Sequence, residues 1–195
     1  QWLTYTERIF SLSFDITDDA IAERRAIYAF FADKGFCDFV ATIDGKAYTL
    51  KDVVIAGDSD HSMMEGVMLP AVLQFMAGEP LFQTVTETDW EDAGTETITN
   101  DGDMAADLII EVRGIFSDLQ VENETTNESV DMTYSVDGDT VKIDSFNWAI
   151  TIDTDNGWPY CTEDSKPPKL AKGENIVTIS TGEYRYKKIE YYASL

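Results

Sequence analysis

Apolar and polar residues alternate along much of this chain, as they do in β-strands that bury one face. The first such stretch covers residues 10–16, in which phenylalanine, leucine and isoleucine alternate with serine and aspartate. The pattern changes over residues 17–34, where apolar residues recur at helical spacing after Thr17, a suitable N-cap, and before Gly35, a suitable stop. This region therefore predicts one strand followed by one helix.

Two apolar runs then flank the pair Asp44-Gly45, which suits the positive φ angles of a two-residue hairpin turn. These runs, residues 39–43 and 46–55, predict a β-hairpin. Residues 61–78 predict a long strand, bent near Pro70. The acidic stretch 85–97 predicts a loop or a fraying edge.

Beyond residue 100, short strand-like segments recur with turn residues between them, a pattern typical of an antiparallel sandwich or barrel. The segments cover residues 108–114, 119–123, 128–136, 139–145, 148–153, 174–182 and 184–195. Turn residues and small residues cluster over 99–107, where we place a domain boundary. The chain is predicted to be mostly β with minor α content: an N-terminal β-rich domain with one helix, residues 1–100, then an antiparallel β-sandwich, residues 101–195.

The stretch 122–144 shows the β pattern at its clearest. Its alternation places Val130, Met132, Tyr134 and Val136 on one face, and then Val141 and Ile143 on the face of a following strand. Asp137-Gly138 predicts a tight turn between the two strands. We expect one face to build a core, so this stretch is architecture and not a reaction centre.

Charge narrows the classes of partner. The chain has 14 basic and 37 acidic residues, a net charge of −23. Residues 1–100 hold 6 basic and 18 acidic residues (net −12), and the remainder holds 8 and 19 (net −11). A surface of this sign repels phosphate backbones and anionic membranes, because nucleic-acid affinity depends largely on Lys and Arg. Two explanations of the acidic excess are solubility and a surface that nucleic acid must pass without adhering. Composition alone favours solubility.

The two cysteines, Cys37 and Cys161, lie in different halves and predict reduced thiols. No signal-peptide pattern is visible, and no apolar run approaches the ~20 residues of a membrane helix. The single histidine, His61, has Asp58, Asp60 and Ser62 nearby, but neighbours this close in sequence rarely form a triad, so a solvated loop is preferred.

Two stretches of the chain are candidates for metal binding and for glycan binding. The stretch 153–157, Asp-Thr-Asp-Asn-Gly, departs from the calcium-loop spacing and suits a hairpin turn instead. No metal, cofactor or catalytic residue is therefore predicted, and the chain is not expected to be an enzyme. Trp148, Trp158 and Tyr160 could stack on sugar rings, although packing at the sandwich rim is the preferred interpretation. They are the candidate carbohydrate contacts.

The order of features over residues 97–195 resembles the second domain of siphophage distal tail proteins. The similarity lies in a strand with Asn-x-Gly and small residues before Gly114, and in the run 121–144 with its paired threonines and Gly-Asp turn. It continues through the hairpin 149–157, the Leu-x-x-Gly-x-Asn strand at 170–180 and a final tyrosine-rich strand. Residues 7–82 are similar to the N-terminal domain of that family, less sharply. The glycines that mark turns in this pattern are Gly45, Gly114, Gly138, Gly157 and Gly173.

The resemblance implies a structural virion protein of a phage tail tip. Members form a homo-hexameric ring through the N-terminal domain, between the tail tube protein and the tail-tip hub, and DNA passes through the lumen without specific binding. The C-terminal domain is galectin-like and often carries receptor-binding proteins. Assembly in the host cytoplasm, absence of membrane insertion and further sequence upstream of Gln1 are also expected. The alternative is a carbohydrate-binding β-sandwich module.

Overall fold

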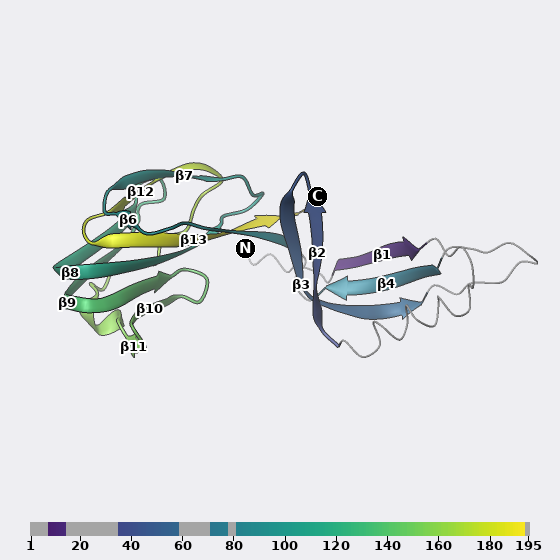
Figure 1. Ribbon diagram of the computed structural model, residues 1–195, viewed down its shortest axis with the longest axis horizontal. Coiled ribbons are helices and arrows are strands. Elements are labelled where there is room, and N and C mark those ends of the chain that lie inside the picture. Colours follow the sequence, from purple (N-terminus) through teal and green to yellow (C-terminus); the bar gives the residue numbers. More distant parts are fainter. Residues whose placement is uncertain (1–7, 15–34, 59–70, 78–80, 194–195) are drawn as a thin grey trace, which may run out of the picture. The chain divides into compact units, whose positions relative to one another are not determined.

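The computed structural model describes residues 8–14, 35–58, 71–77 and 81–193 of the chain (Figure 1). Its described residues are mostly antiparallel β-strand with almost no helix, which confirms the predicted fold class. The chain divides into two compact units, Gln1–Phe82 with Ala193–Leu195, and Gln83–Tyr192. The predicted helix over 17–34 lies outside the described residues.

The first unit contains four described strands: β1 (Arg8–Phe14), β2 (Cys37–Ile43), β3 (Lys46–Asp58) and β4 (Ala71–Ala77). β1 pairs with β4, β4 with β3, and β3 with β2, all antiparallel. The β2–β3 turn has φ 50° at Asp44 and φ 79° at Gly45, so the predicted hairpin is confirmed. Of the predicted strand over 61–78, the described part forms β4.

The second unit begins with three strands in the region predicted as an acidic loop: β5 (Phe82–Glu87), β6 (Glu91–Asp92) and β7 (Thr95–Asn100). They form strands because β5 and β6 pair with the last strand, β13 (Glu183–Tyr192), and β7 pairs with β12 (Gly173–Ile179). These pairings place residues 83–100 in the second unit, whereas the domain boundary was predicted at residue 100.

The centre of the second unit is a hairpin of two 17-residue strands, β8 (Asp107–Asn123) and β9 (Glu128–Asp144). The first half of β8 pairs with β13 and with the second half of β9, while its last residues pair with β12. β10 (Ala149–Ile152) and β11 (Asp155–Asn156) extend the sheet beyond β9, and the short 3₁₀ helix η1 (Trp158–Tyr160) follows. The long hairpin therefore contributes to both layers of a sandwich.

The tight turn predicted at Asp137-Gly138 is replaced by a bend inside β9. Gly138 has φ 92° within the strand, and the pairing register shifts between Arg113 and Ile115 on the facing strand. Gly114, with φ 138°, occupies the level of that shift. Left-handed glycines on both strands let the hairpin bend without ending, because a glycine permits a bulge as readily as a turn.

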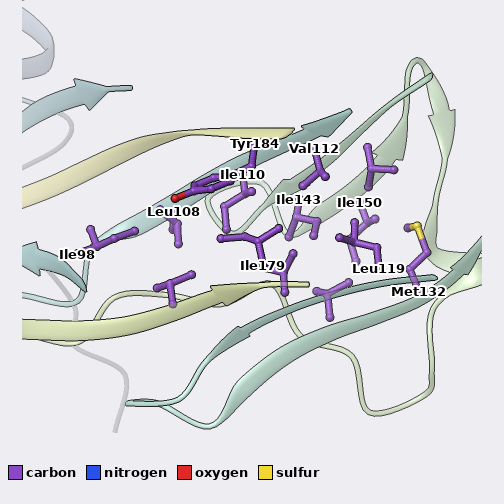
Figure 2. Close-up of a cluster of buried hydrophobic side chains, with 14 of the residues drawn as sticks. Ile98, Leu108, Ile110, Val112, Leu119, Met132, Ile143, Ile150, Ile179 and Tyr184 are labelled. Carbon is purple, nitrogen blue, oxygen red and sulfur yellow. The ribbon is translucent and has the colours of Figure 1, made fainter. Parts of the chain in front are cut away.

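Side chains of the two layers meet in one apolar core (Figure 2). The predicted inward face is confirmed, since Val130, Met132 and Val136 are buried and Tyr134 packs against the cluster. Val141 and Ile143, beyond the bend, are fully buried as well. The core brings together residues from β7 to β13, so the second unit has its own hydrophobic interior.

Candidate interaction surface

The described residues hold no group of three or more His, Cys, Asp or Glu side chains that could bind a metal ion. His61 lies outside the described residues. The aspartates of 153–157 belong to the β10–β11 hairpin, in which Ile152 pairs with Asp155 and the turn falls at Asp153-Thr154. Among the helices of the described residues, none is long and apolar enough to cross a membrane.

The three predicted carbohydrate contacts lie together around η1. Trp148 precedes β10, and its ring stacks on that of Trp158 with centroids 6.4 Å apart and an interplanar angle of 29°. Tyr160 lies at the other end of η1, and its ring contacts that of Tyr134 on β9 at 4.6 Å. Trp148 and Tyr160 are 52% and 44% exposed, whereas Trp158 and Tyr134 pack against the core. Each exposed ring therefore rests on a partner ring that the core fixes.

The turn that presents Trp148 is held by a buried carboxylate at the end of β9. Asp144 accepts hydrogen bonds from the backbone N–H and the side-chain amide of Asn147, at 2.9 and 3.0 Å, and pairs with Lys142 at 3.2 Å. Burial alone would raise the pKa of Asp144, but these hydrogen bonds lower it below its ordinary value. Trp148 follows with φ 53°, an unusual backbone conformation for a bulky residue.

Three carboxylates act electrostatically on Tyr134 of the second ring pair. Partial burial, and then the negative charges of Asp139, Asp155 and Asp153, raise the pKa of the Tyr134 phenol. Asp153 also accepts a hydrogen bond from the backbone N–H of Thr140 at 2.9 Å. Tyr134 was predicted only as a core position. Its role in the cluster depends on a contact between distant strands, which a strand pattern alone does not reveal.

Gly157, one of the predicted turn glycines, has an ordinary φ of −86° and lies immediately before η1. A Cβ at this position would lie 2.9 Å from the Cγ2 atom of Ile150, so the glycine permits η1 to pack closely on β10. Gly173, by contrast, has φ 91° where β12 begins. Gly157 is therefore needed for close packing against Ile150, and Gly173 for its positive φ angle.

A second aromatic site, which was not predicted, involves Trp90 between β5 and β6. The guanidinium groups of Arg113 and Arg185 lie 4.1 and 4.8 Å from the centroid of its ring. Both arginines also bind carboxylates across the strands, Glu183 and Glu111 respectively. These contacts attach the segment before β6 to the sheet and occupy two arginines that could otherwise face a ligand.

The segment from Thr162 to Leu170 covers an edge of β9. The backbone N–H groups of Thr162 and Lys166 donate to the carbonyl oxygens of Asp131 and Ser129, at 2.9 and 2.6 Å. Such a cover prevents another strand from pairing with that edge. The stretch containing Pro167-Pro168 thus lies in an edge-covering loop.

The Leu-x-x-Gly-x-Asn motif is structural as well. Asn175 is fully buried, and its amide donates to the carbonyl oxygens of Ala171 and Gly173 at 2.8 and 2.9 Å. Its oxygen accepts from the Ala171 backbone N–H at 2.8 Å and from the Asn123 amide at 3.1 Å. The motif therefore closes the loop that leads into β12.

These features define a class: a mostly antiparallel β-protein of two compact units, the second of which exposes aromatic rings at its surface. Residues 95–193 match the family described as "Siphovirus-type tail component, C-terminal domain". The matched segment spans half of the chain, so the chain belongs to this family of phage tail components. Its place is therefore in the virion, and the family resemblance seen in the sequence is confirmed.

One solved structure supports the fold. The chain is similar to the crystal structure of the SPP1 Dit protein, described as "a Paradigm of Hub Adsorption Apparatus in Gram-positive Infecting Phages". The alignment has a TM-score of 0.66 and 14% identity, and covers 96% of this chain and 80% of that chain. Two structures of the phage P2 baseplate in its activated conformation, with Ca and with Sr, give TM-scores of 0.43 at 11% and 12% identity. Each covers 94% of this chain and 79% of that chain. No curated protein matches the sequence.

Proposed function

We propose that this chain builds a homo-hexameric ring at the phage tail tip, joining the tail tube protein to the tail-tip hub and to receptor-binding proteins. The observation that carries the proposal is the family match over the second unit, together with a fold likeness that extends over 96% of the chain. In this role the chain works by assembly and performs no chemistry. The first unit forms the ring, and the second, expected to be galectin-like, projects from it.

A closed ring needs a heterologous interface, in which two different patches of each copy meet around a rotation axis. Within the described part of the first unit, β2 pairs on one side only, with β3. Its region exposes the apolar side chains of Phe36, Val40 and Ile43. An exposed strand with apolar side chains is suited to pairing with a second copy, which supports β2 as one of the two patches.

The acidic balance supports a role for the lumen. With −12 and −11 in the two halves, a ring of these chains would carry negative charge on most of its surfaces. DNA crossing a lumen of like charge is repelled by the wall and does not adhere. A structure of the ring with a neutral or basic lumen would reduce the acidity to a matter of solubility.

The mass of the natural full-length polypeptide in native mass spectrometry tests the ring. We expect the mass of six copies. The 195 residues of this chain account for 21.9 kDa of each copy. Ile43→Glu should shift the assembly toward monomers by placing a charge on the proposed patch. Ile176→Glu is the matched control, because Ile176 on β12 of the second unit is 42% exposed and Ile43 is 43% exposed. A wild-type chain that stays monomeric at high concentration would refute the ring.

A further inference from the structure

The aromatic cluster around η1 presents two ring faces at the surface in fixed orientations. Trp148 stacks on Trp158 and leaves about half of its surface exposed, while Tyr160, also about half exposed, contacts Tyr134 at an interplanar angle of 57°. Exposed aromatic rings that contact partly buried rings packed against the core lose little freedom when a ligand covers them. This arrangement differs from isolated exposed apolar side chains, which need no explanation.

The backbone at Trp148 adds a second, independent observation. A left-handed φ of 53° at a residue with a Cβ is strained and persists where the surroundings impose it. Here the hydrogen bonds from Asn147 to the buried Asp144 impose it. Asparagine or glycine would adopt this conformation at lower cost, so the turn holds a large ring where a small residue fits the backbone better.

Charge limits what can lie on these rings. Asp139, Asp153 and Asp155 act on Tyr134, and the chain as a whole carries −23. Anionic polymers such as polyphosphates are repelled at this surface. Hydroxyl groups, by contrast, donate readily to carboxylates, which accept at both oxygens. Aromatic rings in a field of negative charge therefore suit a ligand that combines apolar C–H faces with many hydroxyl groups.

We propose that Trp148 and Tyr160 are stacking platforms for the pyranose rings of an uncharged glycan, with Trp158 and Tyr134 as positioning residues behind them. The sugar hydroxyls would donate to the carboxylates of Asp139 and Asp155. The proposal does not depend on the hexameric assembly, since all of these residues belong to the second unit. It gives the tail component a contact with a neutral surface polysaccharide.

The test uses the full chain with a panel of neutral gluco-, galacto- and N-acetylhexosamine hexasaccharides, and with polyglycerol phosphate as the anionic arm. Saturation-transfer NMR and tryptophan fluorescence follow binding. We expect at least one neutral hexasaccharide to bind, and polyglycerol phosphate not to bind. Trp148→Gly, which removes the ring and suits the left-handed backbone, should weaken binding about tenfold. Tyr160→Ala should weaken it by a similar factor.

Ile115→Ala is the control variant, because Ile115 is 84% exposed on β8, outside the aromatic cluster. It should bind as the wild type does. Thermal unfolding of Trp148→Gly separates lost binding from lost structure. The proposal fails if no neutral hexasaccharide binds the wild type at millimolar concentration, if polyglycerol phosphate binds as well, or if Trp148→Gly binds normally. Native mass spectrometry of Trp148→Gly should show an unchanged assembly. A failure of the glycan proposal is therefore distinct from a failure of the proposed hexameric assembly.

Discussion

Replacing Asn175 by alanine should destabilise the second unit strongly. The wild-type amide is fully buried and makes four hydrogen bonds of 3.1 Å or shorter, to Ala171, Gly173 and Asn123. A net bond contributes about 1 kcal/mol, but each partner left unsatisfied in the interior costs about 1–3 kcal/mol. Water can reach Ala171, which is half-buried, so only part of that penalty applies. We expect a loss of about 3 kcal/mol in the free energy of unfolding.

Urea denaturation followed by tryptophan fluorescence measures this loss, because Trp90, Trp148 and Trp158 all lie in the second unit. The midpoint should fall while the m-value stays constant, since the unit still unfolds as a whole. Asn127→Gly is the control: Asn127 is exposed in a turn with φ 54°, and its replacement should change the free energy by less than about 0.5 kcal/mol. If the free energy of unfolding of Asn175→Ala lies within about 0.5 kcal/mol of the wild-type value, Asn175 does not stabilise the loop that leads into β12.

Three further predictions address other parts of the second unit. Gly182→Ala should lower the melting temperature in calorimetry, because Gly182 has φ 81° and a Cβ there would lie 2.6 Å from a carbonyl oxygen of β8; an unchanged melting temperature would contradict this close approach. Burial and the Glu96 carboxylate raise the pKa of Tyr186 from 10.0 to about 12, so the neutral phenol is favoured in the fold and stability should fall as pH rises through that interval. Ultraviolet titration of Glu96→Gln should show a lower pKa for Tyr186, and an identical titration would refute the contribution of Glu96. Raising NaCl from about 0.01 to about 1 M, which shortens the Debye length from about 30 to about 3 Å, should raise the urea midpoint by screening self-repulsion; a falling midpoint would show that surface ion pairs outweigh that repulsion.

Local sequence signals predicted those features whose cause is local. Asp44-Gly45 determines the β2–β3 hairpin because both positive φ angles lie within the pair. The alternation around Met132 identified a core face because burial repeats every second residue. Gly138 shows the limit: whether its positive φ makes a turn or a bend depends on Gly114 of the facing strand. Pairing across strands decides such cases, and a single segment does not contain it.

The candidate surface shows the same division. Trp148, Trp158 and Tyr160 could be chosen from the sequence as aromatics near a predicted strand. Their grouping into two ring pairs needed the close passage of η1 over β10 and the contact of Tyr160 with β9. No local sequence pattern marks the Trp90 site, because its partners, Arg113 and Arg185, come from strands far away in the chain.

Electrostatics connects the ring proposal with the glycan proposal. Cations of the described residues are largely engaged in ion pairs within the chain: Lys51, Arg113, Lys142, Lys169, Lys172, Arg185, Lys187 and Lys188 each pair with a carboxylate. Because these cations are paired within the chain, the excess carboxylates make the electrostatic potential at the surface negative. A phosphate backbone is therefore repelled, whereas the lysines and arginines of a DNA-binding protein would attract it. In the glycan proposal, the same potential would exclude anionic polymers from the aromatic cluster and leave neutral sugars unaffected. Under the two proposals, one sign of charge would let a tail component keep DNA from adhering and still contact an uncharged glycan.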